Sequence, residues 1–248
     1  MRIRPFAFIT IFFCTALLVI ASCKGEEVKD AKPTAPVQAA PSMRVLFIGN
    51  SYTFVNGGID KQFKGLAPSI ETLSIAVGGA KLENHWNDGK ALQEIMKGGW
   101  NYVVLQEQSQ TPVCYQPKFR EFAGNFDREI RANGAKTVLL MTWERPDSAQ
   151  YGVTTANMST VFSTAGTELG VIVAPAGIAF ARSLRARPGL ALYSQDGHPT
   201  ICGTYLAACV LYATIFRQSP VGNPYSDSGI PPETRAYLQR IAAESVGL

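Results

Sequence analysis

The chain has 248 residues, of which 46% are hydrophobic, and a formal net charge of +4. This composition excludes a disordered or fibrous protein and fits one sizeable folded domain with additional segments. Two of the positive charges, Arg2 and Arg4, lie at the extreme N-terminus, and the body of the chain has no run of Lys or Arg. We therefore expect no nucleic-acid partner.

The N-terminal segment has the pattern of a secretory signal: a positive start, an apolar stretch and small residues before Cys23. The sequence IASC at residues 20–23 resembles the lipobox of bacterial lipoproteins. This resemblance implies a signal peptide over residues 1–22 and a lipid on Cys23. An uncleaved membrane helix is the alternative, because the apolar stretch is nearly long enough to span a bilayer.

Residues 23–42 form the next segment, which is polar and contains repeated Ala and Pro. Such a segment buries too little apolar surface to fold, so a flexible tether is predicted. The folded domain is then expected over residues 43–248. Its setting is expected to be the bacterial cell envelope, with a membrane contact through the lipid on Cys23, on the outer-membrane or periplasmic side in a Gram-negative cell.

Short apolar runs alternate with segments of helical spacing in this domain, which predicts a parallel β-sheet built from βαβ units. Most of the apolar runs do not alternate with polar residues, as is typical of strands covered on both faces. Strands are expected over 44–49, 72–77, 101–106, 136–143 and 170–176. Helices are expected over 92–99, 119–134, 154–170, 204–216 and 231–246.

Polar clusters follow the first three predicted strands: Gly49-Asn50-Ser51, Gly78-Gly79 and the run from Gln106 to Ser109. The carboxyl ends of parallel strands share one edge of the sheet, where such folds bind ligands. A serine there needs a base to become a nucleophile. The chain contains only two histidines, His85 and His198.

His198 is the better candidate base, because Asp196 lies two residues before it and a carboxylate can orient an imidazole. His85 has no acid at a fitting spacing and is expected to be structural or to line the rim. No metal-ligand spacing, dinucleotide-binding motif or phosphate-binding loop occurs, so no cofactor and no metal are expected.

Four stretches together resemble the SGNH/GDSL hydrolase superfamily: IGNSYT, VGGAKLENHW, NYVVLQEQSQTP and DGHPTICGTYLAA. They are most similar to a branch with GNSYT in place of GDS. The resemblance implies a three-layer α/β/α flavodoxin-like fold with a five-stranded parallel sheet in the order 2-1-3-4-5. It also implies Ser51 as nucleophile, His198 as general base and acid, and Asp196 as its orienting group.

For the oxyanion hole, the resemblance implies the backbone N–H groups of Ser51 and Gly79 and a side-chain amide from the third stretch. Gln106 fits the branch best and is favoured, whereas Gln108 matches the asparagine of the superfamily's GxND motif by position. One residue separates Asp196 from His198, where two are common in the superfamily. A backbone carbonyl or a water molecule can replace Asp196 as the orienting group.

The sequence as a whole predicts a serine esterase that acts on O-acyl groups, particularly acetyl groups, of carbohydrates or other small-molecule esters. The alternative is a non-catalytic carbohydrate-binding lipoprotein with a degenerate site. The rim aromatics Tyr52, Trp86, Trp143 and Tyr193 can either stack on sugar rings or belong to the core. The oligomeric state is not predicted. The sequence is compatible with two states of the cysteines. Either Cys114 and Cys202 form a disulfide, or Cys114, Cys202 and Cys209 are all buried thiols.

Overall fold

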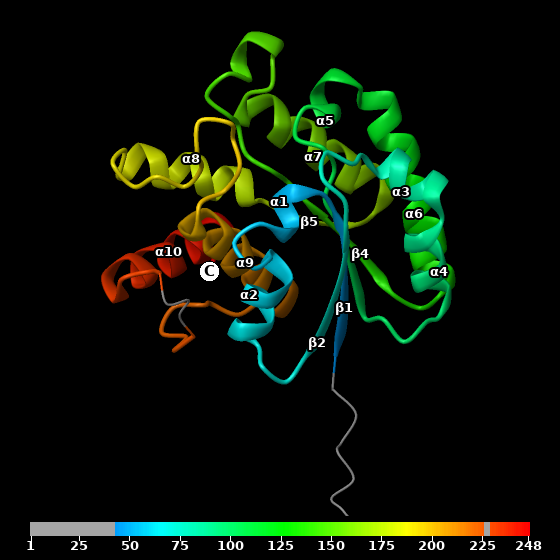
Figure 1. The fold of residues 1–248 in the computed structure, drawn as a ribbon, viewed down its shortest axis with the longest axis horizontal. Helices are drawn as coiled ribbons and strands as arrows, with labels where there is room; N and C mark the ends of the chain where they lie inside the picture. The colour runs from blue at the N-terminus through cyan, green and yellow to red at the C-terminus, as the bar shows by residue number, and fades with distance from the viewer. Residues whose placement is uncertain (1–42, 226–228) are drawn as a thin grey trace, which may run out of the picture. The chain divides into compact units, whose positions relative to one another are not determined.

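The structure is a computed structural model that describes residues 43–225 and 229–248. The predicted signal, Cys23 and the whole of the predicted tether lie outside the described residues. One sheet of five parallel strands forms the centre, in the order β2-β1-β3-β4-β5 (Figure 1). Both the parallel sheet and its strand order agree with the sequence prediction. The strands are β1 (Arg44–Gly49), β2 (Glu71–Ala76), β3 (Tyr102–Leu105), β4 (Lys136–Leu140) and β5 (Ile172–Ala174).

The side chains of β1 show why this strand is apolar from Val45 to Ile48. Val45 and Phe47 belong to the core on one face of the sheet, whereas Leu46 and Ile48 belong to the core on the other face. Successive residues of a strand point to opposite faces, so a strand covered on both sides needs apolar residues at every position. β5 is shorter than predicted because Pro175 follows it and has no N–H to continue the ladder.

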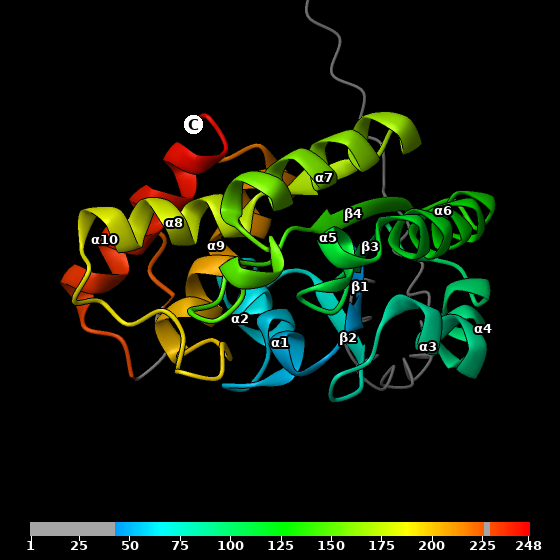
Figure 2. The ribbon, with the colours of Figure 1, turned by 90° about the horizontal axis from the view of Figure 1, so that it is seen from above.

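Helices cover both faces of the sheet, which gives the predicted three-layer α/β/α architecture (Figure 2). One face carries α2 (Ile59–Leu66), α8 (Ala176–Ala186), α9 (Ile201–Phe216) and α10 (Pro232–Ser245). The other face carries α3 (Leu82–Asp88), α4 (Lys90–Met96), α6 (Gln116–Ala132) and α7 (Thr155–Leu169). Three shorter elements lie in the connections: α1 (Ser51–Phe54), α5 (Thr111–Cys114) and the 3₁₀ turn η1 (Ala149–Tyr151).

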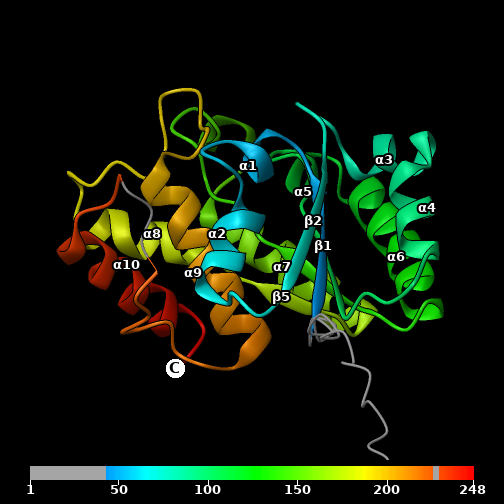
Figure 3. The same cartoon turned by 60° about the horizontal axis from the view of Figure 1, so that its bottom comes forward.

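Helix α9 is the most buried helix of its layer and fixes the loop that precedes it. Its sequence, ICGTYLAACVLYATIF, is apolar nearly all round, as expected for a helix packed on several sides. The Thr200 hydroxyl caps its first turn by accepting from the Gly203 N–H. The loop that ends at Thr200 is therefore anchored to the start of a well-packed helix. This loop lies beside α1 (Figure 3).

The three cysteines of the described domain are separate thiols, so a bridge between Cys114 and Cys202 does not form. Cys114 ends α5, which packs against α6 and α7, whereas Cys202 lies in the first turn of α9 on the other face of the sheet. Cys209 is buried, but Cys114 is exposed and Cys202 is partly exposed, so the expectation of three buried thiols is also wrong. Within residues 43–225 and 229–248, no helix combines the length and the apolar character that crossing a membrane requires.

Candidate active site

Ser51 lies directly after β1, at the first position of the short helix α1. The Asn50 side chain caps this helix by accepting from the Tyr52 N–H at 3.1 Å. Gly49 is needed before the turn, because a Cβ there would lie 2.3 Å from Thr53 Oγ1 and 2.6 Å from Gln106 Oε1. The abrupt change from an apolar strand to Gly-Asn-Ser thus builds a tight strand-to-helix turn that presents the serine.

The structure brings the predicted serine, histidine and aspartate together. Ser51 Oγ lies 2.8 Å from Nε2 of His198, although the two residues are 147 positions apart in the sequence. On the other side of the ring, His198 Nδ1 lies 2.9 Å from Oδ2 of Asp196. Because a carboxylate only accepts hydrogen bonds, Nδ1 carries a proton and Nε2 is left free to accept the serine proton.

Gly197 makes the one-residue spacing between Asp196 and His198 possible. Its φ angle of +84° lies in the left-handed region, where a side chain is strained. A Cβ at this position would also lie 2.3 Å from Arg145 Cδ and 2.8 Å from the Tyr52 hydroxyl. Glycine thus turns the chain back within one residue, so the Asp196 carboxylate reaches both the ring and the backbone N–H of His198.

Two residues outside the predicted site hold this loop in place. The Ser194 hydroxyl donates to Asp196 Oδ1 at 2.6 Å, and this hydrogen bond is the main reason that the pKa of Asp196 falls to about 2. Asp196 therefore stays ionised at any pH at which an esterase works. The Trp143 indole N–H donates to the Gly197 carbonyl at 3.0 Å. The serine two residues before Asp196 was a signal in the sequence, whereas the Trp143 contact spans 54 positions and had none.

Two backbone N–H groups near the turn, those of Ser51 and Gly79, have no hydrogen-bond partner among the described residues. Gly79 has a φ of +69°, and the space where its Cβ would stand is open. A glycine without a neighbour at this point lets a ligand approach the backbone closely. The two groups suit a negatively charged oxygen.

The two candidate amides behave differently. Gln106 is 1% exposed, and its Oε1 accepts from the Asn50 N–H and from the Thr53 hydroxyl, both at 2.9 Å. Its Nε2 donates to the Glu107 carbonyl at 2.6 Å. Gln108 uses its Oε1 to accept from Gln110 and Thr111, whereas its Nε2 has no partner among the described residues.

A solved structure of a candidate SGNH hydrolase from Slackia heliotrinireducens has the same fold as the chain. It is 29% identical to the chain, covers 70% of it and 98% of its own length, and has a TM-score of 0.61. The chain belongs to the SGNH hydrolase superfamily. Scans against protein-family models and curated proteins gave no match.

More distant structures share the fold of this SGNH hydrolase. A DUF4886 family protein from Bacteroides uniformis is 19% identical, with a TM-score of 0.65, over 82% of the chain and 94% of its own length. A variant of Axe2, an acetyl xylan esterase from Geobacillus stearothermophilus, is 14% identical to the chain and has a TM-score of 0.51. The match covers 75% of the chain and 98% of the Axe2 variant. At these identities, the likeness shows the fold alone.

Aromatic rings form a column behind Ser51 and His198. Tyr52 lies edge-on to His198 with ring centroids 5.4 Å apart and stacks on Trp143 at 4.8 Å. Trp143 stacks in turn on Phe180, and Phe180 on Tyr193. Tyr52 and Trp143 are buried, so they belong to the core and do not offer a face to a sugar. Tyr193 is partly exposed and lines a cavity of about 180 Å³ beside the column.

His85 is structural, as the sequence analysis expected. It is 3% exposed, and its Nε2 lies 2.7 Å from the Gly49 carbonyl. A carbonyl only accepts, so Nε2 carries a proton there and His85 has no free base on this side. Burial lowers the pKa of His85, which keeps the ring neutral. The contact ties α3 to the end of β1, next to Ser51.

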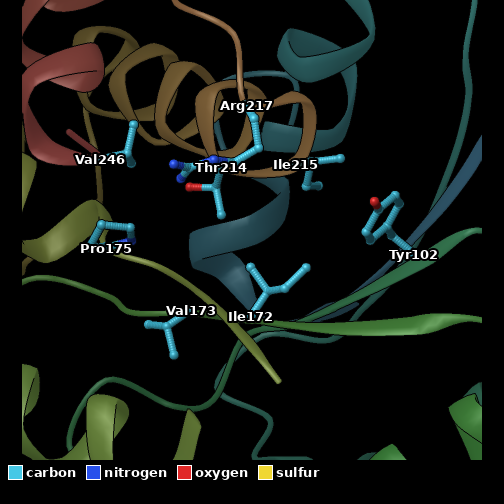
Figure 4. Close-up of a pocket in the computed structure, with 8 residues that line it drawn as sticks. All are labelled: Tyr102, Ile172, Val173, Pro175, Thr214, Ile215, Arg217 and Val246. Carbon is cyan, nitrogen blue, oxygen red and sulfur yellow. The ribbon is translucent and has the colours of Figure 1, made fainter. Parts of the chain in front are cut away.

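A larger cavity lies away from the serine. It has a volume of about 390 Å³ and is lined by Tyr102, Ile172, Thr214 and Arg217, among others (Figure 4). Tyr102 and Ile172 begin β3 and β5, so this cavity lies at the amino ends of the strands, whereas Ser51 follows the carboxyl end of β1. In the part of the chain that the structure describes, no group of three or more His, Cys, Asp or Glu is arranged to hold a metal ion.

Proposed function

We propose that this SGNH hydrolase is a serine esterase in which Ser51 is the nucleophile. The observation that supports this proposal most strongly is the continuous chain of contacts from Ser51 Oγ to His198 Nε2 and from His198 Nδ1 to Asp196 Oδ2, at 2.8 and 2.9 Å. The His198 side chain is 38% exposed, so a substrate and a water molecule can both reach it.

The reaction proceeds in two halves. Ser51 Oγ attacks the ester carbonyl while Nε2 of His198 takes the hydroxyl proton, and a tetrahedral intermediate forms. The intermediate collapses as His198 returns this proton to the departing alcohol, which leaves an acyl group on Ser51. A water molecule then loses a proton to His198 and attacks the acyl carbon, and His198 protonates Ser51 as the carboxylic acid leaves. Asp196 stays ionised throughout and stabilises the imidazolium.

The contacts support Gln108, rather than the Gln106 that the sequence favoured, as the amide of the oxyanion hole. Together with the N–H groups of Ser51 and Gly79, the free Nε2 of Gln108 completes a set of three donors. Gln106 instead holds the turn that carries Ser51, through the Asn50 N–H and the Thr53 hydroxyl.

We expect Gln108→Ala to lower kcat by about 10²–10³-fold, because it removes an oxyanion donor. Its Tm should fall less than that of Gln106→Ala, because the Gln110 and Thr111 N–H groups that lose their acceptor are only part-buried and water can replace it. Gln106→Ala should also lower Tm, because two buried donors lose their acceptor, at about 1–3 kcal/mol each. Steady-state kinetics and thermal unfolding of both variants measure this difference. A Gln108→Ala enzyme with normal kcat, beside a stable but inactive Gln106→Ala enzyme, would place the amide at Gln106.

The proposed substrates are O-acyl groups, particularly acetyl groups, on carbohydrates. The shared fold with an acetyl xylan esterase supports this class, and partly exposed Tyr193 beside the loop of His198 offers an aromatic face for a sugar ring. The proposed setting is the bacterial cell envelope, with the chain held at a membrane by a lipid on Cys23. The lipobox-like IASC sequence at residues 20–23 supports this placement.

Release of acetate from acetylated xylan, measured beside hydrolysis of p-nitrophenyl acetate, tests the proposed function. We expect wild-type protein to hydrolyse both and Ser51→Ala protein to hydrolyse neither. If wild-type protein hydrolyses p-nitrophenyl acetate but releases no acetate from xylan, the proposed esterase activity is supported and the proposed carbohydrate substrate is contradicted. If both proteins bind the glycan and neither releases acetate, the carbohydrate-binding alternative holds instead.

A further inference from the structure

Glu107 is a buried acid next to the active site that the proposed mechanism leaves without a role. It follows β3 by two residues and is 2% exposed. The Gln108 N–H donates to its Oε1 at 2.6 Å, and the Leu82 N–H lies 3.3 Å from Oε1 and 3.4 Å from Oε2. One carboxylate therefore joins the loop after β3 to the start of α3.

Both of these segments carry proposed oxyanion donors. Leu82 comes three residues after Gly79, whose N–H is one donor, and Gln108 supplies the side-chain amide. The loop of Gly79 is also joined to the turn of Ser51, through the hydrogen bonds from Asn50 Nδ2 to the Ala80 carbonyl at 3.0 Å and from the Val77 N–H to the Gly49 carbonyl at 3.1 Å. The Glu107 carboxylate adds the link to the loop after β3.

We propose that Glu107 is a positioning residue that sets the distance between the Gly79 N–H and the Gln108 amide. This inference rests on the proposed esterase function. Donors fixed in advance stabilise an oxyanion better than donors that must be gathered during the reaction. A displacement of about 1 Å in such a site can lower the rate by about 10²-fold. A residue that joins two donor loops therefore acts on kcat without touching the substrate.

The surroundings of Glu107 determine its charge. Burial raises its pKa to about 7, against the hydrogen bonds from Gln108 and Leu82 and the attraction of Lys81, which lower it. A cavity of about 140 Å³ lies against the residue, and the charged or titratable groups around it are Lys81 and Glu83 at the start of α3 and Tyr115 and Lys118 at the start of α6. Both charge states are populated near neutral pH.

The two charge states differ in how firmly they hold the loops. An ionised carboxylate accepts hydrogen bonds roughly twice as strong as those that a neutral acid accepts. As the pH rises through about 7, Glu107 loses its proton and becomes the stronger acceptor for the Leu82 and Gln108 N–H groups. Positioning by Glu107 therefore strengthens towards alkaline pH.

Full-length wild-type, Glu107→Gln and Glu107→Ala proteins, assayed on p-nitrophenyl acetate from pH 6 to 8.5, test this role. Glutamine keeps an acceptor oxygen but has no charge at any pH. We expect the ratio of wild-type to Glu107→Gln kcat/KM to rise about three- to tenfold across this range, with its midpoint near pH 7. His198 is common to both proteins and cancels in the ratio. Glu107→Ala should lose about 10–10²-fold in kcat with little change in KM.

Glu83→Gln is the matched control, because Glu83 lines the same cavity and pairs with Lys118 but bonds neither loop. We expect its kcat to stay within twofold of wild type. A ratio for Glu107→Gln that does not change with pH would overturn the proposal, whether or not Glu107→Ala folds. The esterase itself is tested separately, because a wild-type rate that Ser51→Ala abolishes establishes it whatever the Glu107 variants show.

Discussion

Replacing Ser51 by alanine is expected to lower kcat/KM for p-nitrophenyl acetate by about 10⁴–10⁶-fold, because the acyl group then has no acceptor on the protein. Little stability should be lost, since the Ser51 side chain makes one hydrogen bond, to His198, and the helix cap on Asn50 remains. Steady-state kinetics with circular dichroism as a check on folding measure the effect. The remaining rate comes from substrate binding and the oxyanion donors.

A serine on another helix provides the control. Ser163 is exposed on α7, where its hydroxyl donates only to the Thr160 carbonyl. Ser163→Ala should keep wild-type kinetics. A folded Ser51→Ala protein that retains more than a few per cent of the wild-type rate would show that another group carries out the hydrolysis.

The two histidines allow the second large effect to be tested within one chain. His198→Ala should lower kcat/KM by about 10⁴-fold or more, because no other base contacts Ser51 Oγ in the part of the chain that is described. His85→Gln should keep most of the activity, since a glutamine amide can still donate to the Gly49 carbonyl as the ring does. Rates measured for both variants at one pH give the comparison.

The opposite pattern would contradict the proposed roles. An active His198→Ala enzyme would exclude the histidine as general base. An inactive but folded His85→Gln enzyme, beside an active His198→Ala enzyme, would assign the base to His85 in α3. Because burial lowers the pKa of His85, that ring stays neutral at physiological pH in either case.

The sequence predicted the parallel sheet from local patterns, whereas the meeting of Ser51, His198 and Asp196 was implied by the resemblance to the SGNH/GDSL superfamily. Apolar runs specify strands covered on both faces, and polar residues at strand ends meet at one edge. The details that decide the geometry are not local. The short Asp-Gly-His turn requires glycine at position 197, because its φ is positive and distant residues, Arg145 and Tyr52, leave no room for a Cβ.

The roles of Gln106 and Glu107 show the same limit. Both are polar residues at the end of β3, and the sequence alone does not tell which side chain faces the substrate. In the structure, Gln106 turns towards Asn50 and Thr53, and Glu107 turns towards Leu82. These partners lie between 25 and 56 positions away, so periodicity and spacing carry no signal for them.

Covalent labelling by a fluorophosphonate, located by peptide mass spectrometry, tests the central claim most directly. Such a probe reacts with a serine only where a base activates it. We expect one labelled residue, Ser51, with labelling lost in Ser51→Ala and strongly slowed in His198→Ala. Label on a different residue, or hydrolysis by wild-type protein that the probe neither labels nor inhibits, would contradict it.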